Sequence, residues 1–138
     1  MYYLYKLSLS GTPKYYVGVT NNPVTRQAGH ISAINESIRS LRSGKDLLGE
    51  AYHIVIAKHI LSVEKKKYRQ DPIFFVSFKV VLEAGETLEK AISAENRYLS
   101  RRGKHCLNKI GRSYYKGGRV DYSARYKWIC DQMSKGVL

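Results

Sequence analysis

The first part of this 138-residue chain predicts a β-hairpin that leads directly into a helix. Residues 2–9 and 14–20 alternate aromatic or aliphatic with polar side chains, which is the period of a half-buried strand. The turn-forming residues 10–13 (Ser-Gly-Thr-Pro) join them, so we expect the two strands to pair antiparallel. Asn22 followed by Pro23 begins a helix, because asparagine caps the first turn and proline fits the first helical position.

Two helices are predicted after the hairpin. The first runs to Arg42 and is ended by Ser43 and Gly44. Its apolar residues recur at helical spacing: Val24, Ala28, Ile31, Ile38 and Leu41. The second is expected from about Asp46 to Tyr68, although its β-branched stretch at residues 54–56 is less typical of a helix.

The second half of the chain predicts one more strand and two further helices. The dense Phe and Val run from Ile73 to Leu82 is typical of a buried central strand. A helix is expected over about Thr87–Arg101, and a short one over about Tyr122–Ser134, beyond a basic, loop-rich stretch. This order predicts an α+β fold, in which a small antiparallel three-stranded sheet, made of the hairpin and the central strand, is flanked by helices.

The length favours one domain over residues 1–138. We expect a core over about 2–110, a helical insertion over about 46–70 and a basic C-terminal extension over 111–138. No segment is apolar enough to cross a bilayer, and the N-terminus does not resemble a signal peptide. We therefore expect a cytoplasmic protein, in a bacterium or a phage-infected cell, with reduced cysteines and without a membrane partner.

The charge of the chain favours a polyanionic partner. Lys and Arg number 24 against 11 Asp and Glu, which leaves a net charge of +13. Much of the excess lies after Arg97, where tyrosines alternate with the basic residues, as phosphate contact with base stacking would require. The same rings fit a packed core equally well. The residues expected to contact DNA are Lys14, Arg101, Arg102, Lys104, Asn108, Lys109, Arg112, Lys116 and Arg119.

Two tyrosines of the hairpin are candidates for chemistry. With residues 10–13 unpaired, Tyr5 faces Gly18, and Tyr5 and Tyr16 are diagonal neighbours on one sheet face, roughly 7–8 Å apart. Two hydroxyls beside a glycine can orient water, although a phenol with an ordinary pKa near 10 is a poor base unless a cation lowers that pKa. Tyrosine is also an ordinary strand residue, so this pair alone is weak evidence.

Arg26 and His30 add a second part to this site. They are four residues apart on the first helix and share one face, and Arg26 lies in the first turn, where the helix dipole favours an anion. Arg26 would hold a phosphate oxygen, while His30 would shuttle a proton or donate to a leaving oxygen. The alternative is that both are ordinary polar surface residues.

Glu95 stands out because it lies in the apolar stripe of the third predicted helix, with Leu88, Ala91, Ile92 and Leu99. A carboxylate pointed at a core needs compensation by a cation. Hard oxygen ligation suits a Mg²⁺ ion that also meets a phosphate. A salt bridge, for instance with Arg26, is the alternative that the sequence leaves open.

Together these residues resemble the signature of the GIY-YIG nuclease family, over about 110 residues from Tyr3 to Asn108. The matching motifs are Tyr3-Leu4-Tyr5, the run Tyr15-Tyr16-Val17-Gly18-Val19-Thr20-Asn21-Asn22, then Arg26, His30 and Glu95, with Leu107-Asn108 similar to the element that closes the family's core. Tyr3 stands where the family usually has its first glycine, Val17 where it has isoleucine, and Val19 where it often has lysine. The missing lysine puts the activation of Tyr16 in doubt, and Lys6 or Lys14 could substitute.

The resemblance implies a metal-dependent DNA endonuclease of restriction, phage or mobile-element type. Its expected catalytic residues are Tyr5, Tyr16, Arg26, His30 and Glu95, and Glu95 would carry the Mg²⁺, for which Mn²⁺ could substitute. Tyr16, with Tyr5, would take the proton from water, and Arg26 would bind the scissile phosphate. One site cuts one strand, so a homodimer is one route to a double-strand break.

Two alternatives stay open. A catalytically silent nucleic-acid-binding protein of the same fold would keep the basic surface without needing Glu95 in an apolar stripe. A zinc site made by His105, Cys106 and Cys130 is the other, but three ligands without paired spacing match no structural zinc pattern.

Overall fold

The computed structural model describes residues 1–44, 50–63, 72–101, 103, 105–109, 115–116, 119–120, 127 and 131. The chain divides into two compact units: Met1–Ile31 with Asp71–Asn108, and Ser32–Gln70 with Lys109–Leu138. All the residues expected to be catalytic lie in the first unit. No helix within the described ranges is long and apolar enough to span a membrane.

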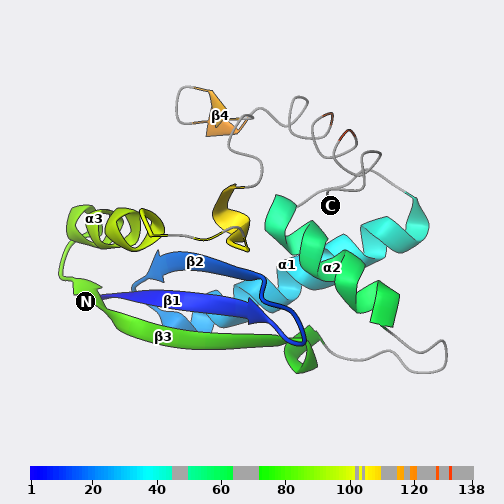
Figure 1. The fold of residues 1–138 in the computed structure, drawn as a ribbon, viewed down its shortest axis with the longest axis horizontal. Coiled ribbons are helices and arrows are strands. Elements are labelled where there is room, and N and C mark those ends of the chain that lie inside the picture. Colours follow the sequence, from blue (N-terminus) through cyan, green and yellow to red (C-terminus); the bar gives the residue numbers. More distant parts are fainter. Residues whose placement is uncertain are drawn as a thin grey trace. The chain divides into compact units, whose positions relative to one another are not determined.

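A three-stranded antiparallel sheet forms the framework of the first unit (Figure 1). β1 (Tyr2–Leu9) is the middle strand, with β2 (Tyr15–Thr20) on one side and β3 (Val76–Gly85) on the other. Tyr5 faces Gly18 in the ladder between β1 and β2, so the predicted hairpin and its register are confirmed. The α+β class is confirmed as well.

The run predicted as the buried central strand is an outer strand instead. A 3₁₀ turn occupies Pro72–Phe74, and β3 begins only at Val76. Val80, Val81 and Leu82 are about two-fifths exposed. Apolar density alone does not distinguish a middle strand from an outer one. β1 takes the middle because the hairpin leaves its second side open, and β3 pairs there.

The outer side of β2 is covered by the segment that follows α3 (Leu88–Leu99). The backbone N–H of Tyr15 donates to the carbonyl of His105 at 3.2 Å. Asn108, in a 3₁₀ turn over Leu107–Lys109, bonds with its side chain to both backbone groups of Val17. These contacts satisfy backbone groups that the edge of a sheet would otherwise leave without a protein partner.

α1 (Pro23–Ser43) follows β2 and is capped as the sequence predicts. Asn22 Oδ1 accepts from the N–H of Thr25 at 3.2 Å, and Gly44 has φ of 65° at the other end. Val24 and Ala28, the first apolar residues of the predicted repeat, lie outside the packed face, because Val24 is 80% exposed and Ala28 is exposed too. The buried face of α1 begins instead with the polar residue His30. Its other buried members are Ile34, Ser37 and Ile38.

The second unit contains α2 (Ala51–Val63), inside the range predicted for the second helix, whose predicted ends lie outside the described residues. Its buried side chains include Tyr52, Ile54 and Ile60. β4 (Tyr115–Lys116) and β5 (Arg119–Val120) pair antiparallel where a loop was expected. The helix predicted over 122–134 lies outside the described residues except for Lys127 and Asp131, which are helical and exposed.

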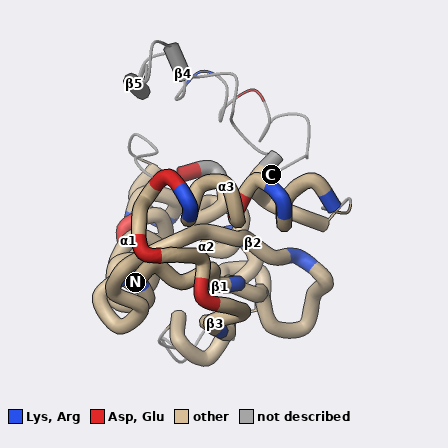
Figure 2. Tube along the Cα trace, turned by 90° about the vertical axis from the view of Figure 1, so that its left-hand side faces the viewer, with Lys and Arg blue, Asp and Glu red and all other residues tan. Residues whose placement is uncertain are grey.

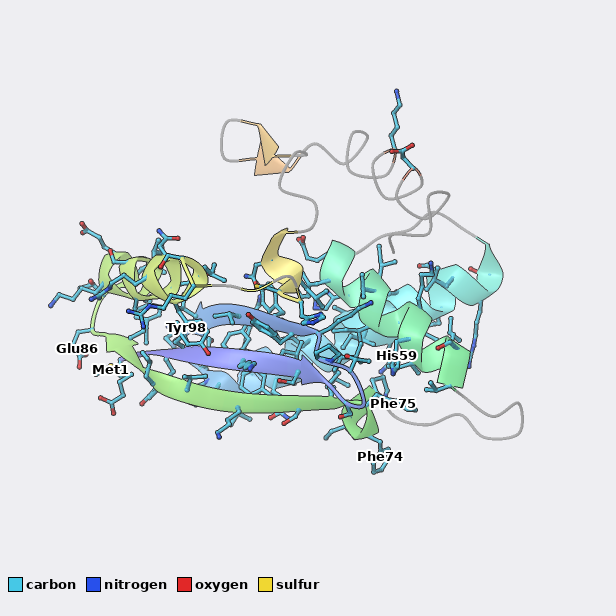
Figure 3. All side chains as sticks on the ribbon, viewed as in Figure 1. Met1, His59, Phe74, Phe75, Glu86 and Tyr98 are labelled. Carbon is cyan, nitrogen blue, oxygen red and sulfur yellow. The ribbon has the colours of Figure 1, made fainter. Side chains whose placement is uncertain are left out.

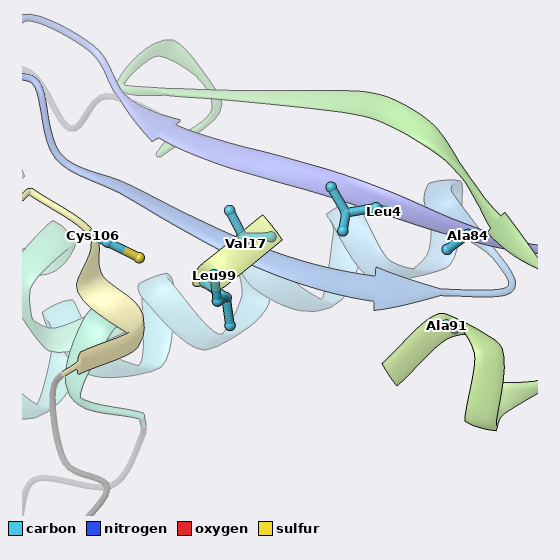
Figure 4. Close-up of a cluster of buried hydrophobic side chains, with 6 residues drawn as sticks. All are labelled: Leu4, Val17, Ala84, Ala91, Leu99 and Cys106. Carbon is cyan, nitrogen blue, oxygen red and sulfur yellow. The ribbon is translucent and has the colours of Figure 1, made fainter. Parts of the chain in front are cut away.

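α3 packs on the sheet face opposite Tyr5 and Tyr16. Thr87 caps it, since its hydroxyl accepts from the N–H of Lys90. Figure 3 shows Tyr98 between α3 and the sheet, and Tyr98 packs against the buried cluster drawn in Figure 4. The members of that cluster are Leu4, Val17, Ala84, Ala91, Leu99 and Cys106.

The apolar stripe predicted for this helix is partly wrong, because Leu88 and Ile92 are 53% and 45% exposed. Small residues face the sheet in their place: Ala91 is buried and Ala94 packs beside it. The helix lies close to the end of β3, since a Cβ on Gly85 would stand 2.7 Å from that of Lys90. So close an approach leaves room for alanine rather than for larger side chains.

Candidate active site

The hydroxyl of Tyr5 is the centre of the candidate site. Tyr5 is fully buried on β1, and its ring extends across Gly18 of β2. A Cβ on Gly18 would lie 2.5 Å from the Tyr5 hydroxyl oxygen, so only glycine leaves this path open. The Tyr5 phenol therefore reaches across β2 to the start of α1.

Two residues of α1 bond to that hydroxyl. Arg26 Nε donates to the Tyr5 oxygen at 3.0 Å, and the distance from that oxygen to His30 Nε2 is 2.7 Å. A guanidinium can only donate, so the single Tyr5 proton is available for His30. The hydroxyl donates to Nε2 when the ring proton of His30 is on Nδ1. The structure thus brings Tyr5, Arg26 and His30 together.

Burial sets the protonation of His30 and Tyr5. Burial, followed by the nearby charge of Arg26, lowers the pKa of His30 from 6.5 to about 4. His30 is therefore neutral at pH 7 and accepts from Tyr5. Burial also raises the pKa of Tyr5, assisted by the charges of Tyr16 and Glu95 and opposed by Arg26. The Tyr5 hydroxyl thus stays protonated at neutral pH and is a hydrogen-bond donor, not a base.

The ring of Tyr16 lies beside this group. Its ring centroid lies 6.3 Å from that of Tyr5 and 5.8 Å from that of His30. The side chain is half-buried. A charge on Tyr16 is one of the causes that raise the pKa of Tyr5.

Glu95 belongs to the same neighbourhood although it comes from α3. It is half-buried, and its charge is one of those that raise the pKa of Tyr5. The carboxylate therefore acts on the hydroxyl that Arg26 and His30 contact. Figure 2 marks the charges along the described chain, where acidic and basic residues both occur on α3.

Phe78 is a residue of this site that the sequence analysis missed. Its ring stacks on that of Tyr5, with 4.6 Å between centroids and 21° between planes. Phe78 pairs with Leu7 in the β1–β3 ladder, two residues from Tyr5. Phe78 could have been placed beside Tyr5 only by knowing that residues 76–85 pair with β1. The sequence of these residues does not reveal which strand they pair with.

Two lysines, Lys6 and Lys14, were candidates to replace the missing family lysine. Lys6 Nζ lies 4.5 Å from the ring centroid of Tyr15, which packs against the α3 cluster, on the face opposite Tyr16. Lys6 is therefore not placed to lower the pKa of Tyr16. Lys14 is exposed at the start of the second hairpin run.

The residues expected to contact DNA fall into three groups. Lys14 and Arg101 are exposed, as a phosphate contact requires. The amide of Asn108 instead bonds to Val17, which gives Asn108 a role in holding the edge of β2. For the remainder the side chains lie outside the described residues: Arg102, Lys104, Lys109, Arg112, Lys116 and Arg119.

The described side chains fit a magnesium site with a single protein carboxylate. Within the part of the chain that the structure describes, no group of three or more His, Cys, Asp or Glu side chains could hold a metal ion. Magnesium often uses one or two protein carboxylates and fills its other positions with water and substrate phosphate. Glu95 fits that single-carboxylate arrangement.

Comparison of the chain with family models, curated proteins and solved structures found no match.

Proposed function

We propose that this protein is a metal-dependent DNA endonuclease of the GIY-YIG type. The observation that carries the proposal is the contact of the Tyr5 hydroxyl with Arg26 and His30, over Gly18 and beside Tyr16. The buried Tyr5 phenol is hydrogen-bonded to Arg26, so it positions a cationic side chain at the start of α1. This arrangement supports binding of a phosphate and stabilisation of the charge that grows there during hydrolysis.

Each side chain has a separate role in the proposed reaction. Arg26 binds a non-bridging oxygen of the scissile phosphate. The Tyr5 hydroxyl accepts a hydrogen bond from Arg26 and keeps the guanidinium of Arg26 in place. His30 stays neutral and fixes the direction of the Tyr5 proton. Tyr16, in its ionised phenolate form, orients the attacking water and takes its proton, which returns Tyr16 to the neutral phenol.

Glu95 would hold the divalent ion, Mg²⁺ or Mn²⁺, which supplies Lewis-acid stabilisation of the leaving oxygen when bound. The half-buried position of Glu95, with its charge acting on Tyr5, supports this role. The net charge of +13 supports a nucleic acid as the substrate. A cytoplasmic setting and a homodimer that cuts both strands remain part of the proposal.

The test is cleavage of supercoiled plasmid and of a length-matched RNA, with Mg²⁺, with Mn²⁺ and with EDTA. The wild type should cut DNA only with the metal, and Glu95→Gln should lose at least about 10²-fold in rate, the scale of one electrostatic contact in a transition state. Glu89→Gln is the matched control, because Glu89 lies exposed on the first turn of the same helix.

Three results would overturn the proposal: equal cutting by both glutamate variants, cutting in EDTA, or DNA binding without cutting in either metal. The last result would favour the silent nucleic-acid-binding protein.

A further inference from the structure

A cleft lies on the sheet face opposite Tyr5 and Tyr16. This cleft of about 680 Å³ opens between α3 and the strands, within the size range of small-molecule sites. It lies in the first unit and is lined by Tyr15, residues 82–84, Ala94, Arg97, Tyr98, Ser100 and Arg101. The chemistry of the candidate active site uses none of these side chains.

The cations of the cleft are concentrated at one end of α3. Arg97 and Arg101 are four residues apart, are both exposed, and both line the cleft. The cleft contains one acidic residue, Glu83, which is exposed on β3. A guanidinium group binds a phosphate with two parallel hydrogen bonds, so each of these arginines is suited to a phosphate contact.

Two half-buried tyrosines form the aromatic part of the cleft. Tyr98 lies between α3 and the sheet, and Tyr15 has the ammonium of Lys6 4.5 Å from its ring centroid. The Tyr15 hydroxyl is held in place by the backbone N–H of Gly103 at 3.5 Å. Leu82, Ala84 and Ala94 add apolar area. Aromatic rings beside cations are what a nucleobase joined to a phosphate requires.

We propose that this cleft binds an unpaired nucleotide of a nucleic-acid strand, with its phosphate on Arg97 and Arg101 and its base against the tyrosines. An unpaired nucleotide is favoured because the faces of a base within a duplex are covered by its neighbours. Glu83 accepts a hydrogen bond from a base amino group or a sugar hydroxyl. The inference deepens the proposed function, because it adds an unpaired segment to the substrate of the same protein.

The test measures binding without cleavage. Full-length Glu95→Gln protein in EDTA is titrated into a labelled single-stranded oligonucleotide and into its duplex, and anisotropy is recorded at several salt concentrations. Arg97→Ala and Arg101→Ala should each weaken single-strand binding by about fivefold and lower the salt slope by about 0.7, the value for one lost phosphate contact. Duplex binding should change less. Both arginines are exposed, so their removal leaves the core intact.

Arg39→Ala is the control for lost charge, because Arg39 is exposed, pairs with Glu36 and does not line the cleft. It should change both affinities by less than about twofold. Equal effects of Arg39→Ala and Arg97→Ala, or equal losses for single strand and duplex, would overturn the proposal, since both indicate charge alone.

A second measurement separates a nucleotide in a strand from a free nucleotide or anion. Amide NMR spectra of the same protein are recorded with the oligonucleotide, with a deoxynucleoside monophosphate and with inorganic phosphate. Shifts at Leu82, Ala94 and Tyr98 with the oligonucleotide, and weaker shifts with the monophosphate, support the proposal. Equal shifts with inorganic phosphate, saturation by the monophosphate at lower concentration, or no shift there would contradict it.

The two proposals can fail separately. If no DNA is cut by the wild type but Arg97 and Arg101 still select single strands, the nuclease proposal fails and the cleft proposal stands. If DNA is cut and both arginine variants bind like Arg39→Ala, the nuclease proposal stands and the cleft proposal fails.

Discussion

The Tyr5 hydroxyl occupies the space that a side chain at position 18 would need. A Cβ on Gly18 would lie 2.5 Å from the hydroxyl oxygen and 2.7 Å from the ring carbon that carries it. Both residues sit opposite one another in the β1–β2 ladder. The glycine of β2 is therefore a steric requirement of the contact that Tyr5 makes with Arg26 and His30.

Gly18→Ala should displace the Tyr5 ring. We expect a loss of about 1–3 kcal/mol in the free energy of unfolding, the usual cost of overpacking, measured by urea titration. Gly29→Ala is the control, because nothing lies within 4 Å of a Cβ there and alanine is favoured inside α1 by about 0.5–1 kcal/mol. Equal stability of the two variants would contradict the close contact.

Tyr5→Phe keeps the ring that stacks on Phe78 but removes the hydroxyl that bonds Arg26 and His30. The free energy of unfolding should fall by about 1–3 kcal/mol, because a buried histidine nitrogen loses its hydrogen-bond partner. Tyr3→Phe on the same strand, where Tyr3 is only half-buried, should cost less. A Tyr5→Phe protein as stable as Tyr3→Phe would show that the bonds to the hydroxyl contribute little.

The free energy of unfolding should decrease as pH falls through the range between the unfolded and folded pKa values of His30. Its pKa is 6.5 when unfolded and about 4 when folded, so between these values the unfolded chain binds more protons. Acidification from pH 6.5 to 4 therefore destabilises the fold, by up to about 3 kcal/mol from this residue, and above pH 6.5 its effect is absent. Urea titrations from pH 4 to 7.5 measure this slope.

His30→Gln should flatten that part of the profile, whatever its effect on stability at pH 7. His59→Gln on α2, outside the candidate site, is the matched control for replacing a histidine by glutamine. A His30→Gln profile parallel to that of the wild type would contradict the lowered pKa.

Asn108→Ala should weaken the edge of β2. Its amide makes bonds of 2.9 and 2.7 Å to the N–H and C=O of Val17, so we expect a loss of about 2 kcal/mol. Asn96→Ala, at an exposed position of α3, should have little effect. Unchanged stability together with reduced DNA affinity would instead favour the direct DNA contact that the sequence suggested.

The local elements of the sheet unit follow from short-range sequence patterns. Alternation and turn residues are properties of neighbouring positions, so the hairpin, its register at Tyr5 and Gly18, and the capped start of α1 could all be predicted. The i, i+4 spacing of Arg26 and His30 on that helix followed from the same local rules. These residues form the centre of the candidate site.

The choice of middle strand and of buried helix face depends on long-range packing. Strand order depends on pairing between distant segments, so β3 proved to be outer and Phe78 came to stack on Tyr5. The buried faces of α1 and α3 depend on how closely each helix packs, which placed His30 inside and left Val24 and Ile92 exposed. The pKa values of Tyr5 and His30 follow from that burial, because desolvation depends on everything packed around a group.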